Sequence, residues 1–211
     1  MEPHVGQPIE TTGRPLGEGR AVMIMIHGRQ AAPVNILQLV DSLSQPEFTY
    51  IAPAAANNTW YPYSFMADKE QNEPGISSGV AVIDGVVSDV VNKGIPKDHI
   101  VLLGFSQGAC LTAEYAVEHA DRFGGVILYS GSVIGPPGTT WAYGGSFDGT
   151  PIFMGCSDVD SHVPLERIEE GAAVFERMGA IVTKRIYPGM GHQINDDEIA
   201  FTQGLMRNLL A

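Results

Sequence analysis

The sequence predicts an α/β fold in which a mainly parallel sheet is flanked by helices on both faces, without a large cap domain. Two observations predict it. Short β-type runs alternate with helical patterns along the chain, and most of these runs are continuously apolar, as in parallel strands covered on both faces. With 211 residues, 44% of them hydrophobic and 17% charged, the chain suits a single domain over residues 1–211.

The predicted strands are short runs rich in β-branched, aromatic and other apolar residues. They span 21–26, 48–51, 100–105, 125–129, 151–155 and 181–187. We expect the segment before Ala21 to add an antiparallel hairpin at one edge of the sheet.

The predicted helices lie between these strands, at 33–44, 76–93, 107–119, 164–178 and 195–210. The last has a clear start signal, because Asn195 suits the N-cap position and Glu198 follows three residues later. Pro164 suits the first turn of its helix, where the missing N–H costs little.

Two long connections interrupt the alternation, at 57–75 and 132–150. Loops of this length in a compact domain are usually functional or disordered, and the aromatic residues of the first argue against disorder. Because ligands of open α/β sheets bind at the carboxyl ends of the strands, where both connections begin, we expect them to wall a pocket.

Residues 104–108 read GFSQG, a G-x-S-x-G motif between a predicted strand and a predicted helix. A turn that merely needs glycine would explain the pattern without any chemistry. The strand-turn-helix context instead favours a nucleophile elbow, in which Ser106 sits on a sharp bend with small residues on either side.

A serine nucleophile needs a base and a carboxylate that orients the base, each placed after a later strand. His192 follows the last predicted strand and is the expected base. Asp158 and Asp160 both follow the strand at 151–155. We favour Asp160 as the acid, and Asp158 remains the alternative unless it only forms a local turn.

The other histidines suit the role of base less well. His4 lies in a predicted tail, His99 in a turn and His119 at a helix end, so we expect these three to be solvated. His162 is so close in sequence to Asp160 that the two are an unfavourable pair of base and orienter.

The oxyanion formed during acyl transfer needs two preorganised donors. We expect the backbone N–H groups of Gln107, at the start of a helix, and of Arg29, in the loop after the first parallel strand. The Arg29 side chain either meets an anionic substrate group or is solvated. We expect His27 to brace its loop and Cys110 to pack in the core.

The net charge of −12 argues against nucleic acid and anionic membranes as partners, because both select basic surfaces. No His, Cys or Asp cluster has metal-ligand spacing, so neither a metal nor a cofactor is predicted. Residues 1–20 carry no apolar signal-peptide core, and runs such as 21–26 are too short to span a bilayer. With only two cysteines, we expect a cytoplasmic protein.

The chain resembles the phospholipase/carboxylesterase family of small α/β-hydrolases, which includes the acyl-protein thioesterases. The resemblance rests on HG at 27–28, GFSQG at 104–108, D-x-x-V-P at 160–164 and GMGH at 189–192. It implies serine-dependent hydrolysis of carboxylic esters or thioesters, with Ser106, Asp160 and His192 at the positions of nucleophile, acid and base. The WYPYSF segment at 60–65 is closer to bacterial carboxylesterases than to thioesterases.

We therefore predict a carboxylesterase that acts on a small-molecule ester, with Trp60, Tyr61 and Tyr63 shaping the substrate pocket. Simple packing beneath a long loop is the alternative role for each of these aromatic residues. The alternative activity is that of an acyl-thioesterase or lysophospholipase, and a non-catalytic ligand-binding protein with the same fold is the rival from another class. The sequence gives no prediction of oligomeric state.

Overall fold

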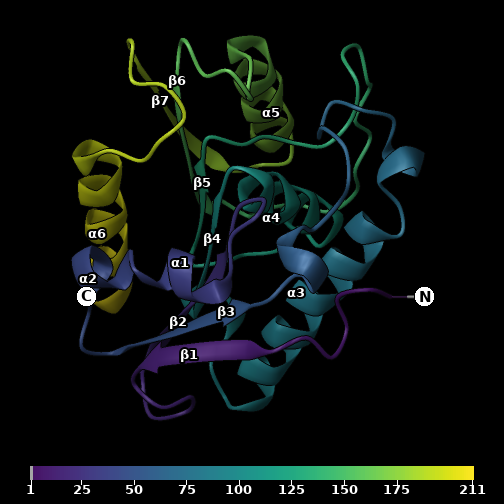
Figure 1. The fold of residues 1–211 in the computed structure, drawn as a ribbon. Coiled ribbons are helices and arrows are strands. Elements are labelled where there is room, and N and C mark those ends of the chain that lie inside the picture. Colours follow the sequence, from purple (N-terminus) through teal and green to yellow (C-terminus); the bar gives the residue numbers. More distant parts are fainter. Residues whose placement is uncertain (1) are drawn as a thin grey trace.

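Figure 1 shows the computed structural model, which describes residues 2–211 as one sheet with helices packed around it. The sheet has seven strands in the order β1-β3-β2-β4-β5-β6-β7. Every neighbouring pair is parallel except β1 with β3. The strands are β1 (Ile9–Gly13), β2 (Ala21–Ile26), β3 (Phe48–Pro53), β4 (Ile100–Phe105), β5 (Gly125–Tyr129), β6 (Pro151–Ser157) and β7 (Ile181–Tyr187). The predicted α/β-hydrolase fold with a mainly parallel sheet is therefore confirmed.

The N-terminal segment adds an antiparallel edge to the sheet, as predicted, but it does so as one strand rather than as a hairpin. β1 pairs antiparallel with β3, from Ile9 opposite Pro53 to Gly13 opposite Thr49. Both sides of β2 are already occupied, by β3 and β4, so the free edge of β3 is the place where an extra strand can pair. All of β1 is exposed, as suits an edge strand.

The helices follow the predicted positions with small shifts. They are α1 (Pro33–Leu37), α2 (Val40–Leu43), α3 (Gly75–Asn92), α4 (Gln107–Glu118), α5 (Leu165–Arg177) and α6 (Asp196–Leu210). The helix predicted at 33–44 is thus two short helices. Pro164 is the N-cap of α5 with extended backbone angles, rather than a residue of its first turn.

Three short 3₁₀ turns complete the chain, η1 (Ala56–Asn58), η2 (Lys69–Asn72) and η3 (Lys97–His99). The first two lie in the long connection between β3 and α3. The capping box at the start of α6 forms as predicted, because the Asn195 side chain accepts from the N–H of Glu198 while the Glu198 carboxylate accepts from the N–H of Asn195.

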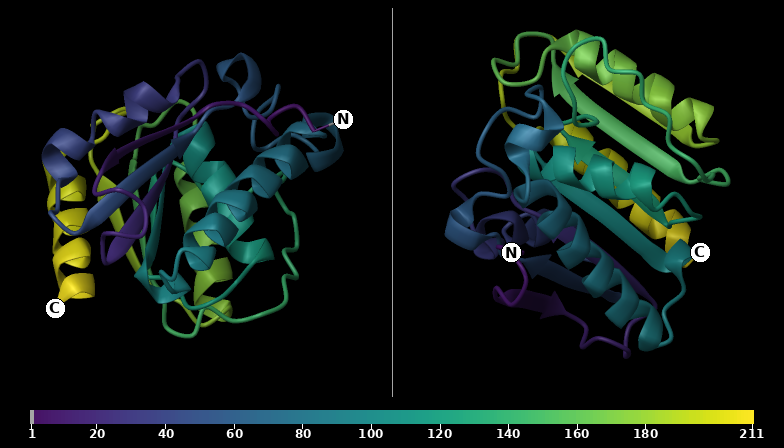
Figure 2. Two further views of the ribbon diagram at one scale, coloured as in Figure 1. Left: turned by 90° about the horizontal axis from the view of Figure 1, so that it is seen from below. Right: turned by 90° about the vertical axis from the view of Figure 1, so that its right-hand side faces the viewer.

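The sheet is covered on both faces, as Figure 2 shows: α3, α4 and α5 lie on one side, and α6 with α1 and α2 on the other. Alternate residues of one strand therefore enter different cores. Ile24 packs with the α3–α5 layer, while Met23 and Met25 pack with the α6 layer. This double burial explains why the central strands are continuously apolar.

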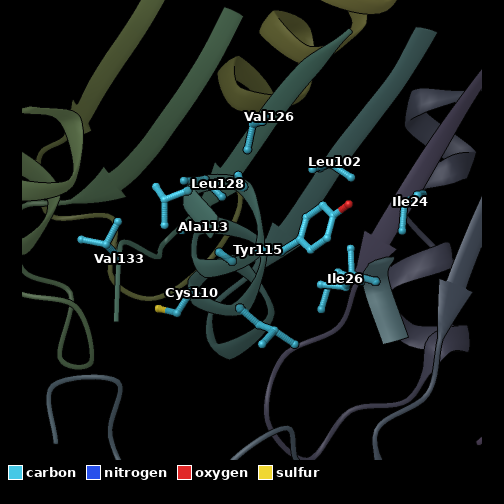
Figure 3. Close-up of a cluster of buried hydrophobic side chains, with 14 of the residues drawn as sticks. Ile24, Ile26, Leu102, Cys110, Ala113, Tyr115, Val126, Leu128 and Val133 are labelled. Carbon is cyan, nitrogen blue, oxygen red and sulfur yellow. The ribbon is translucent and has the colours of Figure 1, made fainter. Parts of the chain in front are cut away.

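The larger core lies between the sheet and α4. Figure 3 shows Ile24, Leu102 and Val126 from neighbouring strands facing Ala113 and Tyr115 of α4. All of these side chains are buried. This packing fixes α4, and with it the residues at its N-terminus, relative to the strand ends.

The helix α3 is long and apolar enough, by length and composition alone, to cross a membrane. Half of it is buried inside the structure, where it packs against β2 and α4. Core helices have the same composition, so α3 is accounted for as one layer of the fold.

The second long connection, 130–150, carries the chain from the end of β5 back to the start of β6 without a helix, where the other parallel crossovers of the sheet contain one. It packs through Phe147 against Phe175 of α5. The indole of Trp141 donates to the carbonyl oxygen of Ile134 within the connection (3.0 Å). This connection therefore covers the space that a crossover helix would fill.

Candidate active site

Ser106 lies on the turn between β4 and α4 with φ 56° and ψ −122°, a backbone conformation that L-residues rarely adopt. The turn is tight because strand and helix nearly touch. A Cβ atom on Gly104 would lie 2.4 Å from the carbonyl oxygen of Gly108, and one on Gly108 would lie 2.2 Å from that of Ile26. Both glycines are thus required by close approach, and the G-x-S-x-G motif has the geometry of a nucleophile elbow.

The three residues predicted as nucleophile, base and acid lie in hydrogen-bond contact. His192 Nε2 is 2.8 Å from Ser106 Oγ, and His192 Nδ1 is 2.7 Å from Asp160 Oδ2. They follow β4, β6 and β7, so the parallel strands bring their carboxyl ends together. This arrangement fits a neutral imidazole whose Nδ1–H donates to the Asp160 carboxylate. Its unprotonated Nε2 can then accept the proton of the Ser106 hydroxyl.

The side chain of Asp160 is buried and its carboxylate is fully hydrogen-bonded. Oδ1 accepts from the backbone N–H groups of His162 (2.8 Å) and Val163 (3.1 Å), and Oδ2 receives the thiol of Cys156 at 3.7 Å in addition to His192. Burial pushes the pKa of Asp160 upward, but the hydrogen bonds from His192 and the backbone outweigh it and leave the pKa below its usual value. Asp160 is therefore held as the anion.

The Asp158 carboxylate contacts the backbone of the loop that carries His192 rather than the imidazole. Its Oδ1 accepts from the backbone N–H of Gly189 (2.8 Å), and the neighbouring Ser157 Oγ accepts from the N–H of Gly191 (3.0 Å). Both contacts tie the loop that carries His192 to the end of β6. Asp158 is thus a brace between two loops, and the carboxylate beside the imidazole is that of Asp160.

The segment expected to complete an oxyanion hole lies beside Ser106. A Cβ on Gly28 would be 3.5 Å from Ser106 Cβ. Within residues 2–211 no acceptor bonds the backbone N–H of Arg29. Gln107 is the first residue of α4, so its N–H has no intrahelical acceptor and lies at the positive end of the helix. Both residues line the same cavity as Ser106, and within residues 2–211 neither N–H has a hydrogen-bond acceptor, so both remain the candidate oxyanion donors.

His27 braces this segment, as predicted. It is fully buried, its Nδ1–H donates to the Gly28 carbonyl oxygen (2.8 Å), and its Nε2 accepts from the N–H of Ala55 (3.1 Å). Burial lowers the pKa of His27. The ring is thus a neutral spacer between the Gly28 turn and the connection that follows β3.

A cavity of about 510 Å³ opens at Ser106 and His192. Tyr61 and Tyr63 line it, as predicted, and Tyr63 is 58% exposed at its mouth. Trp60 does not line it. The Trp60 side chain is fully buried, and its indole N–H donates to the carbonyl oxygen of His27 (2.9 Å), so its role is packing beneath the loop.

Several lining residues were not predicted from the sequence: Phe65, Phe105, Cys110, His162 and Val163. Cys110 stands four residues after Ser106 on α4, and this helical spacing was the signal for its place near the nucleophile. Burial raises the pKa of its thiol to about 11, so it remains a thiol, packed as predicted. The lining includes the first long connection but none of 132–150, so only one of the two walls the cavity as predicted.

His4 is the clearest correction to the sequence analysis. Instead of being a solvated tail residue it is 3% exposed, its Nε2–H donates to the Trp60 carbonyl oxygen (2.7 Å), and its Nδ1 accepts from the N–H of Ala56 (3.0 Å). Its own N–H donates to Ser78 Oγ on α3. The segment before β1 is thus fastened across α3 to the connection that lines the cavity, which no local pattern indicates.

The other histidines and the side chain of Arg29 lie outside the contact between Ser106, His192 and Asp160. His99 and His119 are half-buried at the surface, and the exposed His162 packs edge-on to His192 at 4.7 Å. The Arg29 side chain is exposed, which agrees with the predicted solvated role, and its guanidinium also donates to the carbonyl oxygens of Pro62 and Tyr63. In the described part of the chain, residues 2–211, no group of three His, Cys, Asp or Glu side chains could hold a metal ion.

Comparison with known proteins gives a consistent family. The phospholipase/carboxylesterase family profile matches residues 10–209. A crystal structure of a phospholipase/carboxylesterase from Dyadobacter fermentans is 39% identical, superposes with a TM-score of 0.92, and covers 100% of this chain and 99% of its own. Acyl-protein thioesterase 1 of Eremothecium gossypii is 28% identical over 78% of this chain and 77% of its own length. A probable carboxylesterase of Oryza sativa is 24% identical over 90% of this chain and 78% of its own.

The family profile covers nearly the whole chain, and the fold agrees with that of the structurally similar phospholipase/carboxylesterase. The protein therefore belongs to the phospholipase/carboxylesterase family and is a hydrolase.

Proposed function

We propose that this hydrolase cleaves carboxylic esters of small or medium size through an acyl-enzyme on Ser106. The observation that carries the proposal is the continuous contact from Ser106 Oγ to His192 Nε2 (2.8 Å) and from His192 Nδ1 to Asp160 Oδ2 (2.7 Å). A hydroxyl in such contact with an oriented imidazole is an activated nucleophile.

In the proposed reaction Ser106 Oγ attacks the ester carbonyl carbon while His192 Nε2 takes the hydroxyl proton. The N–H groups of Arg29 and Gln107 stabilise the oxyanion of the tetrahedral intermediate. The intermediate collapses when His192 gives its proton to the leaving alcohol and the C–O bond breaks. Water then attacks the acyl group with His192 as base, which releases the acid and restores Ser106.

Hydrolysis of acyl thioesters is the second candidate. It is favoured by the relative from Eremothecium gossypii, whose name is acyl-protein thioesterase 1. The same three residues would carry it, since only the leaving group changes from an alcohol to a thiol.

A fluorophosphonate probe followed by a substrate panel tests both candidates. We expect wild type to be labelled and Ser106→Ala to remain unlabelled. Equal labelling of the two, or no labelling of wild type, would favour the non-catalytic binding protein. The panel consists of p-nitrophenyl esters and acyl thioesters of matched chain length, and the kcat/KM ratio between the two classes decides between esterase and thioesterase.

Two further parts of the proposal concern the whole chain. Cys110 and Cys156 are free and buried, which suits a reducing compartment, and we place the enzyme in the cytoplasm. We also propose that residues 1–211 form a single domain. A single cooperative unfolding transition, coincident for fluorescence and circular dichroism, is expected of one domain.

A further inference from the structure

Residues Trp60–Tyr63 are called the aromatic wall here because Tyr61 and Tyr63 line the cavity, while Trp60 packs behind them. This segment is neither helix nor strand, and side chains from elsewhere in the chain bind its backbone. Each of its carbonyl oxygens accepts from such a side chain. Trp60 O accepts from His4 Nε2 (2.7 Å), Tyr61 O from Gln107 Nε2 (2.8 Å), Pro62 O from Arg29 Nη1 (2.8 Å), and Tyr63 O from Arg29 Nη2 (2.6 Å). The position of this wall therefore depends on a few side chains.

Two of these residues, Arg29 and Gln107, are also the ones whose backbone N–H groups are the proposed oxyanion donors, and both line the cavity together with Ser106. Gln107 binds the wall twice, because its Oε1 accepts from the N–H of Trp60 (2.9 Å) while its Nε2 donates to Tyr61. Its side chain is nearly buried, at 5% exposure. Arg29 binds the carbonyl oxygens of Pro62 and Tyr63 through two nitrogens of its planar guanidinium. Two bonds from one rigid group fix the orientation of this backbone relative to the Arg29 side chain as well as its distance.

We propose that the side chains of Arg29 and Gln107 couple the aromatic wall to the oxyanion donors and thereby determine which acyl groups react. This inference rests on the proposed esterase function and deepens it. An acyl group too wide for the cavity pushes on Tyr61 or Tyr63. Since the same residues carry the wall and the donors, the displacement reaches the Arg29 and Gln107 N–H groups, and the oxyanion loses stabilisation.

The coupling makes a distinctive kinetic prediction. Wide acyl groups should lower kcat in the wild type, rather than only raise KM, because the misplaced donors act in the transition state. Releasing the wall should restore part of that kcat. A purely structural role of the two side chains would instead lower turnover of all esters in proportion.

The test uses p-nitrophenyl acetate, butyrate, octanoate and benzoate with matched variants. Arg29→Met keeps an unbranched apolar stem but removes both hydrogen bonds, and Arg29→Lys can restore one of them. Gln107→Glu is nearly isosteric and still accepts from the Trp60 N–H, but it cannot donate to Tyr61. Arg20→Met is the control, because Arg20 is exposed and its side chain has no hydrogen bond within residues 2–211.

We expect the kcat ratio of acetate to benzoate to fall about tenfold in Arg29→Met and in Gln107→Glu, to fall less in Arg29→Lys, and to stay at the wild-type value in Arg20→Met. An unchanged ratio in Arg29→Met would overturn the proposal. If Gln107→Glu does not fold, the result for Arg29→Met, at an exposed position, is sufficient to test the proposal. Wild type that hydrolyses no ester and takes no fluorophosphonate label would instead refute the proposed function.

Discussion

The cavity has two walls that are built in different ways. One wall, called the catalytic wall here for its proposed role, consists of Ser106, Asp160 and His192, each in a loop that follows a parallel strand of the sheet. The aromatic wall, Trp60–Tyr63, lies in an irregular connection whose backbone is held by side chains from residues 4, 29 and 107. Strand order fixes the first wall, whereas a few specific hydrogen bonds fix the second, and this difference predicts how each responds to mutation.

The largest expected effect lies in the catalytic wall, at its carboxylate. Asp160→Asn should lower kcat about 10⁴-fold for every ester, because an amide can hold the imidazole in the wrong tautomer and cannot stabilise the imidazolium. Its matched control is Asp158→Asn, two residues away, whose carboxylate has one hydrogen bond within residues 2–211, from the backbone N–H of Gly189. Steady-state kinetics over the ester panel measures both.

The control also settles which carboxylate acts. We expect Asp158→Asn to retain kcat to within about tenfold, since it loosens a loop brace without touching the imidazole. A larger loss for Asp158→Asn than for Asp160→Asn would reverse the assignment. A loss for Asp160→Asn that depended on acyl size would remove the distinction between the two walls.

The next effect concerns stability and lies behind the aromatic wall. His4→Ala should lower the free energy of unfolding by about 3 kcal/mol, because it leaves a void and deprives the Trp60 carbonyl and the Ala56 N–H of their partners. Urea denaturation measures it. His99→Ala, at a half-buried turn position beside the exposed Asp98, should cost about 0.5 kcal/mol or less.

A comparable cost for the two histidine variants would show that His4 is the solvated tail residue that the sequence suggests. In the expected case His4→Ala also changes the acyl-size profile while leaving Ser106 open to fluorophosphonate, since residue 4 touches the wall and not the triad.

The catalytic wall was predictable from sequence because its determinants are local. Continuous apolar runs specify strands buried on both faces, and parallel strands necessarily place the residues that follow them at one edge. Ser106 and His192 could thus be chosen from their motifs and strand positions alone. Between the two candidate acids, only the position of the β6–α5 loop showed that Asp160 faces the imidazole.

The aromatic wall was not predictable in the same way. Its composition marked a pocket, yet Trp60 turned inward to bind His27, and the guanidinium of Arg29 turned to the carbonyls of Pro62 and Tyr63. Such bonds join residues far apart in sequence with no periodic pattern. The same holds for β1, whose partner β3 became evident only once both sides of β2 were occupied.

The smallest expected effect concerns the support of the catalytic wall. It lies at Glu198 in the first turn of α6, the helix that follows the loop carrying His192. Glu198 caps α6 through Oε2, but its buried Oε1 has no hydrogen-bond partner among residues 2–211. Burial raises the pKa of Glu198 to about 7 from 4.5, against the lowering effect of the Asn195 N–H. The folded protein therefore binds a proton more tightly here than the unfolded chain does.

A raised carboxyl pKa favours the folded state fully below the unfolded pKa of 4.5, and this stabilisation is lost as the pH rises toward 7. Glu198→Gln removes the titration, so between pH 5 and pH 8 its free energy of unfolding should fall by about 1–2 kcal/mol less than that of wild type. Glu114, whose buried carboxyl also has its pKa raised to about 7, contributes equally to both proteins and cancels in the difference.

Urea denaturation at the two pH values measures this difference, with Glu166→Gln on the exposed side of α5 as control. Identical pH slopes for wild type and Glu198→Gln would mean that Glu198 is solvated or paired in solution. If only Glu198→Gln loses less stability than wild type between the two pH values, the start of α6 is sensitive to pH. The loop that carries His192 leads into this helix, so the catalytic wall then has a pH-sensitive neighbour although strand order sets its position.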